Sequence, residues 1–123
     1  MTAPNLKIVD VKAFVPARDF EQSKRFYEAI GFTLEWANDG MASFRNGPSS
    51  FLLQKFHVPD HTANFQMSLL VEDVDAWWAH VAAVAKEFGI TVEQPADRPW
   101  GLRDFPLFDP SGVLWRVGQR LAK

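Results

Sequence analysis

The chain of 123 residues contains no cysteine. Without a thiol it forms no disulfide and has no cysteine nucleophile, thiolate-bound zinc or iron–sulfur centre. A chain that uses no cysteine is compatible with a reducing compartment, so we expect a cytoplasmic protein.

A strong charge of one sign and a long apolar run are also missing. The 13 Lys and Arg residues face 15 Asp and Glu residues, a formal net charge of −2, whereas nucleic-acid-binding proteins gather basic residues on one face. The first ten residues lack the basic patch and apolar run of a signal peptide. The most apolar helix-like stretch, residues 76–85, is interrupted by His80 and is well short of the roughly 18 residues of a membrane span. We therefore expect a soluble protein that binds neither nucleic acid nor a membrane.

Apolar side chains are plentiful, with 47% hydrophobic residues, 11 Phe and 5 Trp. This composition supports a buried core and excludes global disorder. The length fits one compact domain over residues 1–123, or two small halves that share a core.

The first half of the chain predicts one strand, one helix and three more strands. The helix is expected to be capped by Asp19 and to end at Gly31. The strands are predicted at residues 8–15, 32–36, 41–46 and 50–56. In the first strand the side chains expected to face the helices are Val9, Val11, Ala13 and Val15.

The second half predicts the same order of elements. Its helix is expected to be capped by Asp73 and to end at Gly89, with an apolar face that contains Val74, Trp77, Val81, Val84 and Phe88. The strands are predicted at residues 65–71, 90–94, 103–109 and 113–118. Pro106 lies inside the third of these strands, which predicts an edge or bulged strand.

The two halves can be aligned with each other, and this internal repeat is the most specific signal in the chain. The matches are Asp19 with Asp73 at an offset of 54, residues 31–36 with 89–94 at 58, and residues 48–53 with 110–115 at 62. Offsets that rise in small steps indicate a duplicated strand–helix–strand–strand–strand unit. The predicted fold is therefore α+β, with two tandem βαβββ modules at about residues 7–57 and 65–120 that form a curved mixed sheet around a central cleft.

This plan resembles the vicinal-oxygen-chelate superfamily, which contains glyoxalase I, bleomycin-resistance proteins and extradiol dioxygenases. The resemblance rests on residues 15–32 and 71–78, and above all on RPWGLRDFPLFDPSGVLWRVG at 98–118, which is most similar to the glyoxalase and bleomycin-resistance-protein branch. It covers nearly the whole chain and implies a single domain of this type. Because the superfamily hosts unrelated activities on one scaffold, function has to be argued from the site.

In metal-dependent members each half supplies two ligands, one from its first strand and one from its last. The resemblance places these four positions at Lys12, Gln54, Gln66 and Arg116. Catalytic divalent ions prefer imidazole and carboxylate ligands, so the resemblance implies that this chain holds no metal and needs no cofactor. A two-residue slip in the first strand would offer Asp10 in place of Lys12, which supplies only one carboxylate.

The remaining candidate ligands are histidines and aspartates. His57 and His61 flank Asp60 in the segment between the halves. These three side chains are either solvated or form a cluster that binds a metal ion. His80 is expected on the surface of the second helix. Asp104 and Asp109 flank a predicted strand and are expected to serve in turns and at the strand edge.

Strand alternation separates side chains that face the helices from those that face the cleft. The cleft side combines aromatic rings with a few polar groups, which is typical of a small-molecule site. Trp100 is either a stacking face on a mobile flap or an anchor that holds its loop to the core, and the other aromatics either bind a ligand or simply fill the cleft. The predicted ligand-binding residues are Lys12, Phe14, Gln54, Phe56, Gln66, Ser68, Trp100 and Arg116.

These observations favour a metal-free protein that binds and sequesters a planar or carbonyl-bearing small molecule. Lys12 and Arg116 favour an anionic ligand over cationic bleomycin. The alternative is an enzyme, either a lyase or isomerase that uses Lys12 as a base or Schiff-base amine, or a metal-dependent glyoxalase or dioxygenase. The resemblance also implies a homodimer, because related chains pair to bury their sheets.

Overall fold

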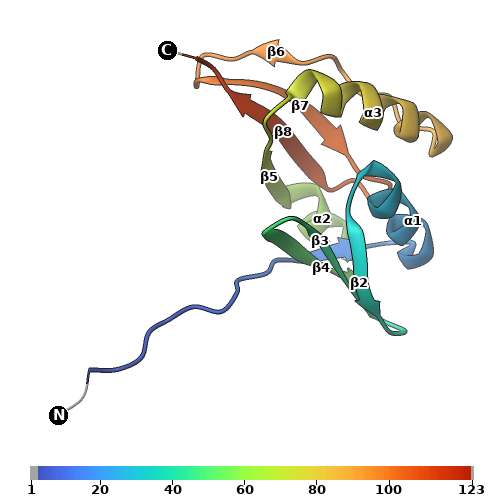
Figure 1. The fold of residues 1–123 in the computed structure, drawn as a ribbon. Helices are drawn as coiled ribbons and strands as arrows, with labels where there is room; N and C mark the ends of the chain where they lie inside the picture. The colour runs from blue at the N-terminus through green and yellow to red at the C-terminus, as the bar shows by residue number, and fades with distance from the viewer. Residues whose placement is uncertain (1–2, 123) are drawn as a thin grey trace.

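The computed structural model describes residues 3–122, and its elements repeat one order twice (Figure 1). Module 1 contains β1 (Phe14–Ala17), α1 (Phe20–Ile30), β2 (Thr33–Ala37), β3 (Met41–Asn46) and β4 (Ser49–Lys55). A short helix, α2 (Pro59–Asn64), leads into module 2. Module 2 contains β5 (Gln66–Leu70), α3 (Val74–Glu87), β6 (Ala96–Asp97), β7 (Leu102–Phe108) and β8 (Leu114–Arg120).

Each module forms its own four-stranded mixed sheet. The strand order is β1-β4-β3-β2 in the first, here called sheet A, and β5-β8-β7-β6 in the second, sheet B. In both sheets the first strand of the module runs parallel to the last, and the other neighbours are antiparallel. The equivalent orders confirm the duplicated βαβββ plan and the α+β class, and neither sheet closes into a barrel.

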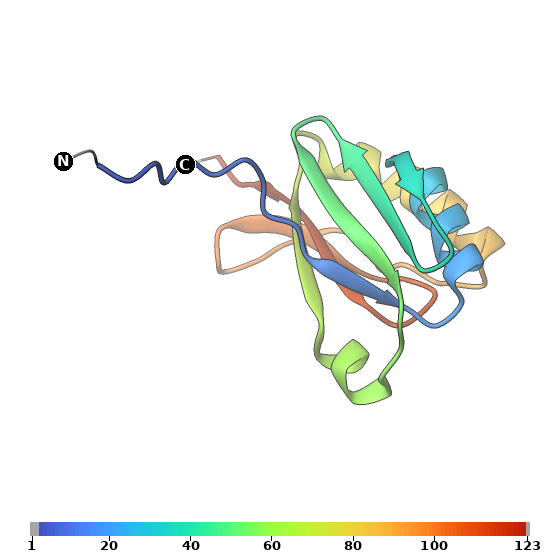
Figure 2. The same cartoon turned by 90° about the horizontal axis from the view of Figure 1, so that it is seen from below.

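α1 and α3 begin where the sequence predicts, and α1 also ends there, whereas α3 ends at Glu87, two residues before Gly89. Asp19 and Asp73 accept hydrogen bonds at 3.1 and 3.0 Å from the backbone N–H groups of Gln22 and Ala76, as N-cap residues do. Gly31 ends α1 with a φ of 129°, a conformation that favours glycine. α1 and α3 lie side by side on one flank of the molecule in both views (Figures 1 and 2).

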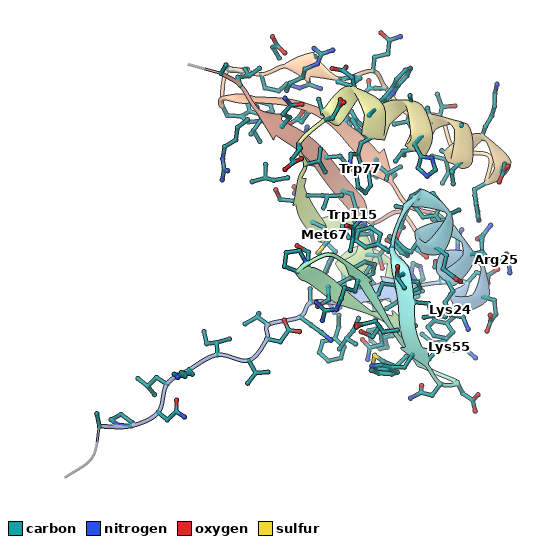
Figure 3. All side chains as sticks on the ribbon, in the orientation of Figure 1. Lys24, Arg25, Lys55, Met67, Trp77 and Trp115 are labelled. Atoms are coloured by element: carbon teal, nitrogen blue, oxygen red, sulfur yellow. The ribbon has the colours of Figure 1, made fainter. Side chains whose placement is uncertain are left out.

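The two modules share one aromatic core between the helices and the sheets. Tyr27 of α1 packs against Trp115 of β8, with ring centroids 5.6 Å apart, and Phe51 of β4 packs against the same indole at 5.2 Å. Figure 3 places Trp115 and Met67 near the junction of the modules, whereas Arg25 lies on the outer side of α1. Since rings from both modules bury one another, each module completes the core of the other.

The first predicted strand is wrong over most of its length. Residues 3–13 form an extended arm without strand structure, whose N-terminal part leaves the body of the molecule (Figures 1 and 2). Pairing with β4 begins only where Leu52 donates a hydrogen bond to the carbonyl of Ala13. Val9 and Val11 are therefore exposed, and only Val15 is fully buried. The alternation of apolar and polar side chains predicted a strand with two faces. Residues 8–11 form none, because no strand within the described chain lies beside them to pair with.

Two further differences fall near module 2. Residues 90–94 form no strand; β6 is limited to the two residues after Pro95, and Ile90 and Val92 pack loosely on the core. The segment between the halves, expected as a loop, contains α2. Pro106 lies in β7, as predicted at an edge of the sheet, because β6 pairs with β7 only at Arg103 and Asp104 and leaves Pro106 uncovered.

No helix within residues 3–122 has the length and apolar character required to cross a membrane.

Candidate small-molecule site

A pocket lies on the face of sheet B turned away from α3, and it is called the sheet B pocket below. Alternation along β8 produces this face, because Trp115 and Val117 point into the core while Arg116 points away from it. Ser68 of β5 is opposite Arg116 in the parallel pairing, so the two polar groups are neighbours across the strands. The pocket is lined by Gln66, Met67, Ser68, Leu70, Trp100, Leu102, Asp104, Arg116 and Gly118.

The centre of this site is the carboxylate of Asp104 on β7, which is completely buried. It accepts a hydrogen bond from Arg98 Nε at 2.9 Å and one from the Trp100 indole N–H at 3.1 Å. Arg116 Nη1 approaches the same carboxylate at 3.4 Å. A buried carboxylate needs such partners, since an unpaired charge away from water is very costly.

Trp100 is held at the rim of the pocket by this network. Its N–H is bonded to Asp104, and the guanidinium carbons of Arg98 and Arg116 lie 6.0 and 5.7 Å from the ring centroid, at cation–π distance. The ring nevertheless remains 57% exposed. The indole is therefore tied down by polar contacts and is not an anchor in the apolar core, and its role as a stacking face for a ligand stays a prediction.

Four of the eight predicted ligand-binding residues line the sheet B pocket. They are Gln66, Ser68, Trp100 and Arg116. The other four lie on or beside sheet A and are absent from the lining of this pocket. Among them, Phe14 and Phe56 are about half exposed, Gln54 pairs with Pro16, and Lys12 donates a hydrogen bond to Ser43 Oγ at 3.4 Å.

The strand register corrects the repeat alignment in the first strand. Phe14 pairs with Leu52, and Gln66 pairs with Leu114. Leu52 and Leu114 are separated by the offset of 62 that aligns the last strands, so Phe14 occupies the position equivalent to Gln66. Lys12 lies two residues earlier, before β1 begins, and forms an ion pair with Asp10 at 3.6 Å.

The residues at the superfamily's ligand positions do not fit a divalent ion. With the register corrected, the four side chains are those of Phe14, Gln54, Gln66 and Arg116, which include no imidazole and no carboxylate. Nor is there, among residues 3–122, a group of three or more His, Cys, Asp or Glu side chains placed to hold a metal. His57 instead shares a hydrogen bond of 3.2 Å with Thr62 in α2, and His80, exposed as predicted, contacts the carbonyl of Ala29 at 2.8 Å.

Sequence reasoning missed Asp104 and Arg98 as parts of the site. Asp104 was expected at a strand edge or turn, but it lies inside β7 with its carboxylate covered. No local pattern marks this role, because it depends on the pairing of Asp104 with two small residues, Ala96 on one side and Gly118 on the other, which leave room for its side chain. Asp109 does serve in a turn, where it accepts from the backbone N–H groups of Ser111 and Val113 at 2.9 Å.

Comparison with known proteins agrees with this fold. Residues 8–117 match the Glyoxalase/Bleomycin resistance protein/Dioxygenase superfamily. The chain belongs to this superfamily. No match was found among curated proteins.

Several solved structures share the fold. A bleomycin resistance determinant encoded on the transposon Tn5 is 22% identical, with a TM-score of 0.76 over 94% of this chain and 100% of the other. The bleomycin-binding protein from Streptomyces verticillus, solved with copper(II)-bleomycin, is 18% identical, with a TM-score of 0.74 over 97% of this chain and 100% of the other. TnmS3, an antibiotic-binding protein from Streptomyces sp. CB03234, is 28% identical, with a TM-score of 0.75 over 95% and 100% of the two chains.

Proposed function

We propose that this protein is a metal-free binding protein that sequesters a planar or carbonyl-bearing small molecule, with an anionic group, in the sheet B pocket. The observation that carries the proposal is the placement of Arg116 beside the exposed ring of Trp100, on a face lined by leucines and small polar groups. An apolar surface with a few convergent polar groups is the usual composition of a ligand site.

Several of the similar structures support a binding function. Three of the similar structures are named for antibiotic binding or resistance, two of them for bleomycin. Bleomycin is cationic, however, and the lining of the sheet B pocket carries the cation Arg116, while the charge of Asp104 is paired by Arg98 from outside the lining. The charge of the pocket therefore favours a ligand of opposite sign from bleomycin.

An enzymatic role for Lys12 receives no support from its surroundings. Its ammonium group lies beside sheet A, where it contacts Ser43 Oγ of β3 and the carboxylate of Asp10. A base or Schiff-base lysine needs a pocket in which a substrate can reach it, and Lys12 is absent from the lining of the sheet B pocket.

A second copy of the chain is the partner that the exposed apolar surfaces favour. The arm carries four large apolar side chains that project into solvent, namely Leu6, Ile8, Val9 and Val11. The outer face of sheet A adds the half-exposed rings of Phe14, Trp36 and Phe56. Exposed apolar surface of this extent is typical of a protein interface, and a homodimer, the commonest closed assembly, would bury it.

The binding function can be tested by titration and by mass spectrometry of gently purified protein. A co-purified planar anion is the expected finding, and adding it back should quench tryptophan fluorescence. Arg116→Ala should weaken its binding by about 1.5–3 kcal/mol, the range for a hydrogen bond to a charged group. Arg25→Ala, on the outer side of α1 (Figure 3), is the matched control and should bind normally. Equal affinity of the two variants would refute this site.

A further inference from the structure

The side chain of Asp104 fits inside sheet B because the residues beside it on the neighbouring strands are small. A Cβ atom added at Gly118 would lie 3.1 Å from Asp104 Cβ, tighter than an ordinary contact. On the other side Asp104 pairs with Ala96, the smallest residue that keeps a side chain. Glycine on the neighbouring strand therefore lets the aspartate side chain lie flat, where Arg98, Trp100 and Arg116 close over it.

The two arginines use this carboxylate unequally. Arg98 bonds it through Nε at 2.9 Å and also reaches the Asp104 carbonyl through Nη2 at 3.4 Å. Arg116 makes one longer contact through Nη1 and, among the described residues, no other hydrogen bond. Arg98 thus largely satisfies the aspartate, while the guanidinium of Arg116 is oriented by it and keeps donors for the pocket.

We propose that Asp104 is a positioning residue that presets Arg116 and Trp100 as a receptor for a ligand with a single oxyanion group, such as one carboxylate. This inference rests on the proposed function and names its ligand class. Ordering the arginine and the indole before binding removes much of the entropy cost of ordering them afterwards.

The charge of the receptor matches one negative charge. Arg98, which is not part of the lining, pairs closely with Asp104 and offsets its negative charge. The positive charge of Arg116 is then the one left in the lining for a ligand to meet. Gln66 and Ser68 line the same pocket and offer hydrogen bonds to neutral atoms of a ligand. A second carboxylate would find no further cation in the lining, so a dianion is expected to bind more weakly than a monoanion of the same shape.

Asp104→Asn separates a positioning role from a merely electrostatic one, because the two predict opposite signs. Asparagine keeps the shape but turns one acceptor oxygen into an NH₂ group that faces donors. If Asp104 positions Arg116, the variant should bind the probe 2-naphthoate at least about tenfold more weakly, the lower end for a charged hydrogen bond. If the aspartate only adds an unfavourable charge, removing it should tighten 2-naphthoate binding, and that result, or no change, would overturn the proposal.

The wild-type protein tests the ligand class. Of three probes, it is expected to bind the monoanion 2-naphthoate most tightly. The dianion naphthalene-2,6-dicarboxylate and the neutral 2-naphthalenemethanol should both bind more weakly. Equal or tighter binding of the dicarboxylate would overturn the single-charge receptor. Failure to bind either carboxylate would overturn the proposed function together with the ligand class.

A measurement without ligand tests the positioning role by itself. The indole N–H resonance of Trp100, assigned by its loss in Trp100→Phe, should move upfield and exchange faster with solvent in Asp104→Asn. Gly118→Ala, which crowds Asp104 without removing its charge, should shift the same resonance. The control Asp97→Asn alters an exposed carboxylate of β6 that pairs with Arg103. This control should leave the Trp100 resonance unchanged. An unchanged Trp100 resonance in folded Asp104→Asn protein would overturn the positioning role whatever the probes show.

Discussion

Tyr27 in α1 donates a hydrogen bond to Asp109 in the turn between β7 and β8, so a buried polar pair joins module 1 to module 2. The same hydroxyl accepts a hydrogen bond from the indole N–H of Trp115 at 2.9 Å. Ser23 and Ser111 make a second contact across this junction, with their hydroxyl oxygens 3.3 Å apart. The modules are therefore held by directional bonds as well as by the aromatic core.

Tyr27→Phe should lower the free energy of unfolding by about 1–3 kcal/mol, because Asp109 loses a donor and the Trp115 N–H loses an acceptor in a buried place. Urea unfolding followed by circular dichroism measures the change. Ser50→Ala removes a longer hydrogen bond of 3.4 Å to Asp10 near the surface and serves as the control, with an expected change within about 0.5 kcal/mol. A similar, small loss in both variants would contradict the structural role of the Tyr27 hydroxyl.

The stability of the protein should depend on pH through Asp109. Burial raises the pKa of this carboxyl above its ordinary value of 3.8, although hydrogen bonds from Tyr27 and from the backbone at Val113 act in the opposite direction. A raised pKa means that the folded state binds the proton more tightly than the unfolded state. The contribution of Asp109 to stability is thus full below pH 3.8 and is lost as the pH rises through the raised pKa.

Asp109→Asn, which cannot titrate, provides the comparison. The free energy of unfolding of the wild type minus that of Asp109→Asn should fall as the pH rises from about 3.5 and then become constant near neutrality. Urea unfolding of both proteins across this range measures the difference. A difference that increases with pH would show that the folded protein lowers the pKa of Asp109.

Protein purified without a tag is expected to contain no stoichiometric zinc, nickel, iron or manganese after dialysis. The reason is chemical, since the positions at which the resemblance implies metal ligands, read with the observed strand register, hold phenylalanine, two glutamines and arginine. Elemental analysis tests this directly. About one metal ion per chain would contradict the proposed binding protein and favour an enzyme.

The proposed homodimer predicts a mass in light scattering of twice the 14.0 kDa of one chain. The double variant Val9→Lys with Val11→Lys places two charges on the exposed arm and should shift the protein to the monomer. Ala83→Lys adds a charge to the exposed side of α3 and should leave the dimer intact. A wild type that remains at the single-chain mass across micromolar concentrations refutes the dimer.

The repeated plan of the fold could be predicted because helix caps and turns depend on residues that are close to one another in the sequence. The caps Asp19 and Asp73 and the glycine at 31 act within one helical turn, so they are visible without any tertiary information. The arm was misread for the opposite reason, since strand formation at Val9 and Val11 requires a partner strand that alternation cannot report.

The candidate site was predictable in part for a similar reason. Gln66, Ser68 and Arg116 come together because alternation on two adjacent strands puts them on one face. The role of Asp104 could not be predicted in this way. It depends on Gly118 across the sheet and on Arg98 and Trp100 folding back from a loop, contacts that exist only once the register of β7 and β8 is known.

The alternation of β8 has a consequence for how this protein can change over generations. Trp115 and Val117 hold the interior together, and Arg116 between them contributes its side chain only to the opposite side of the strand. If the sheet B pocket binds a ligand as proposed, a substitution at Arg116 would change which molecules bind while Trp115 and Val117 keep the interior packed. Because core residues and pocket residues alternate along one strand, evolution could change the ligand of such a protein by single substitutions. This agrees with the variety of functions found on folds of this kind.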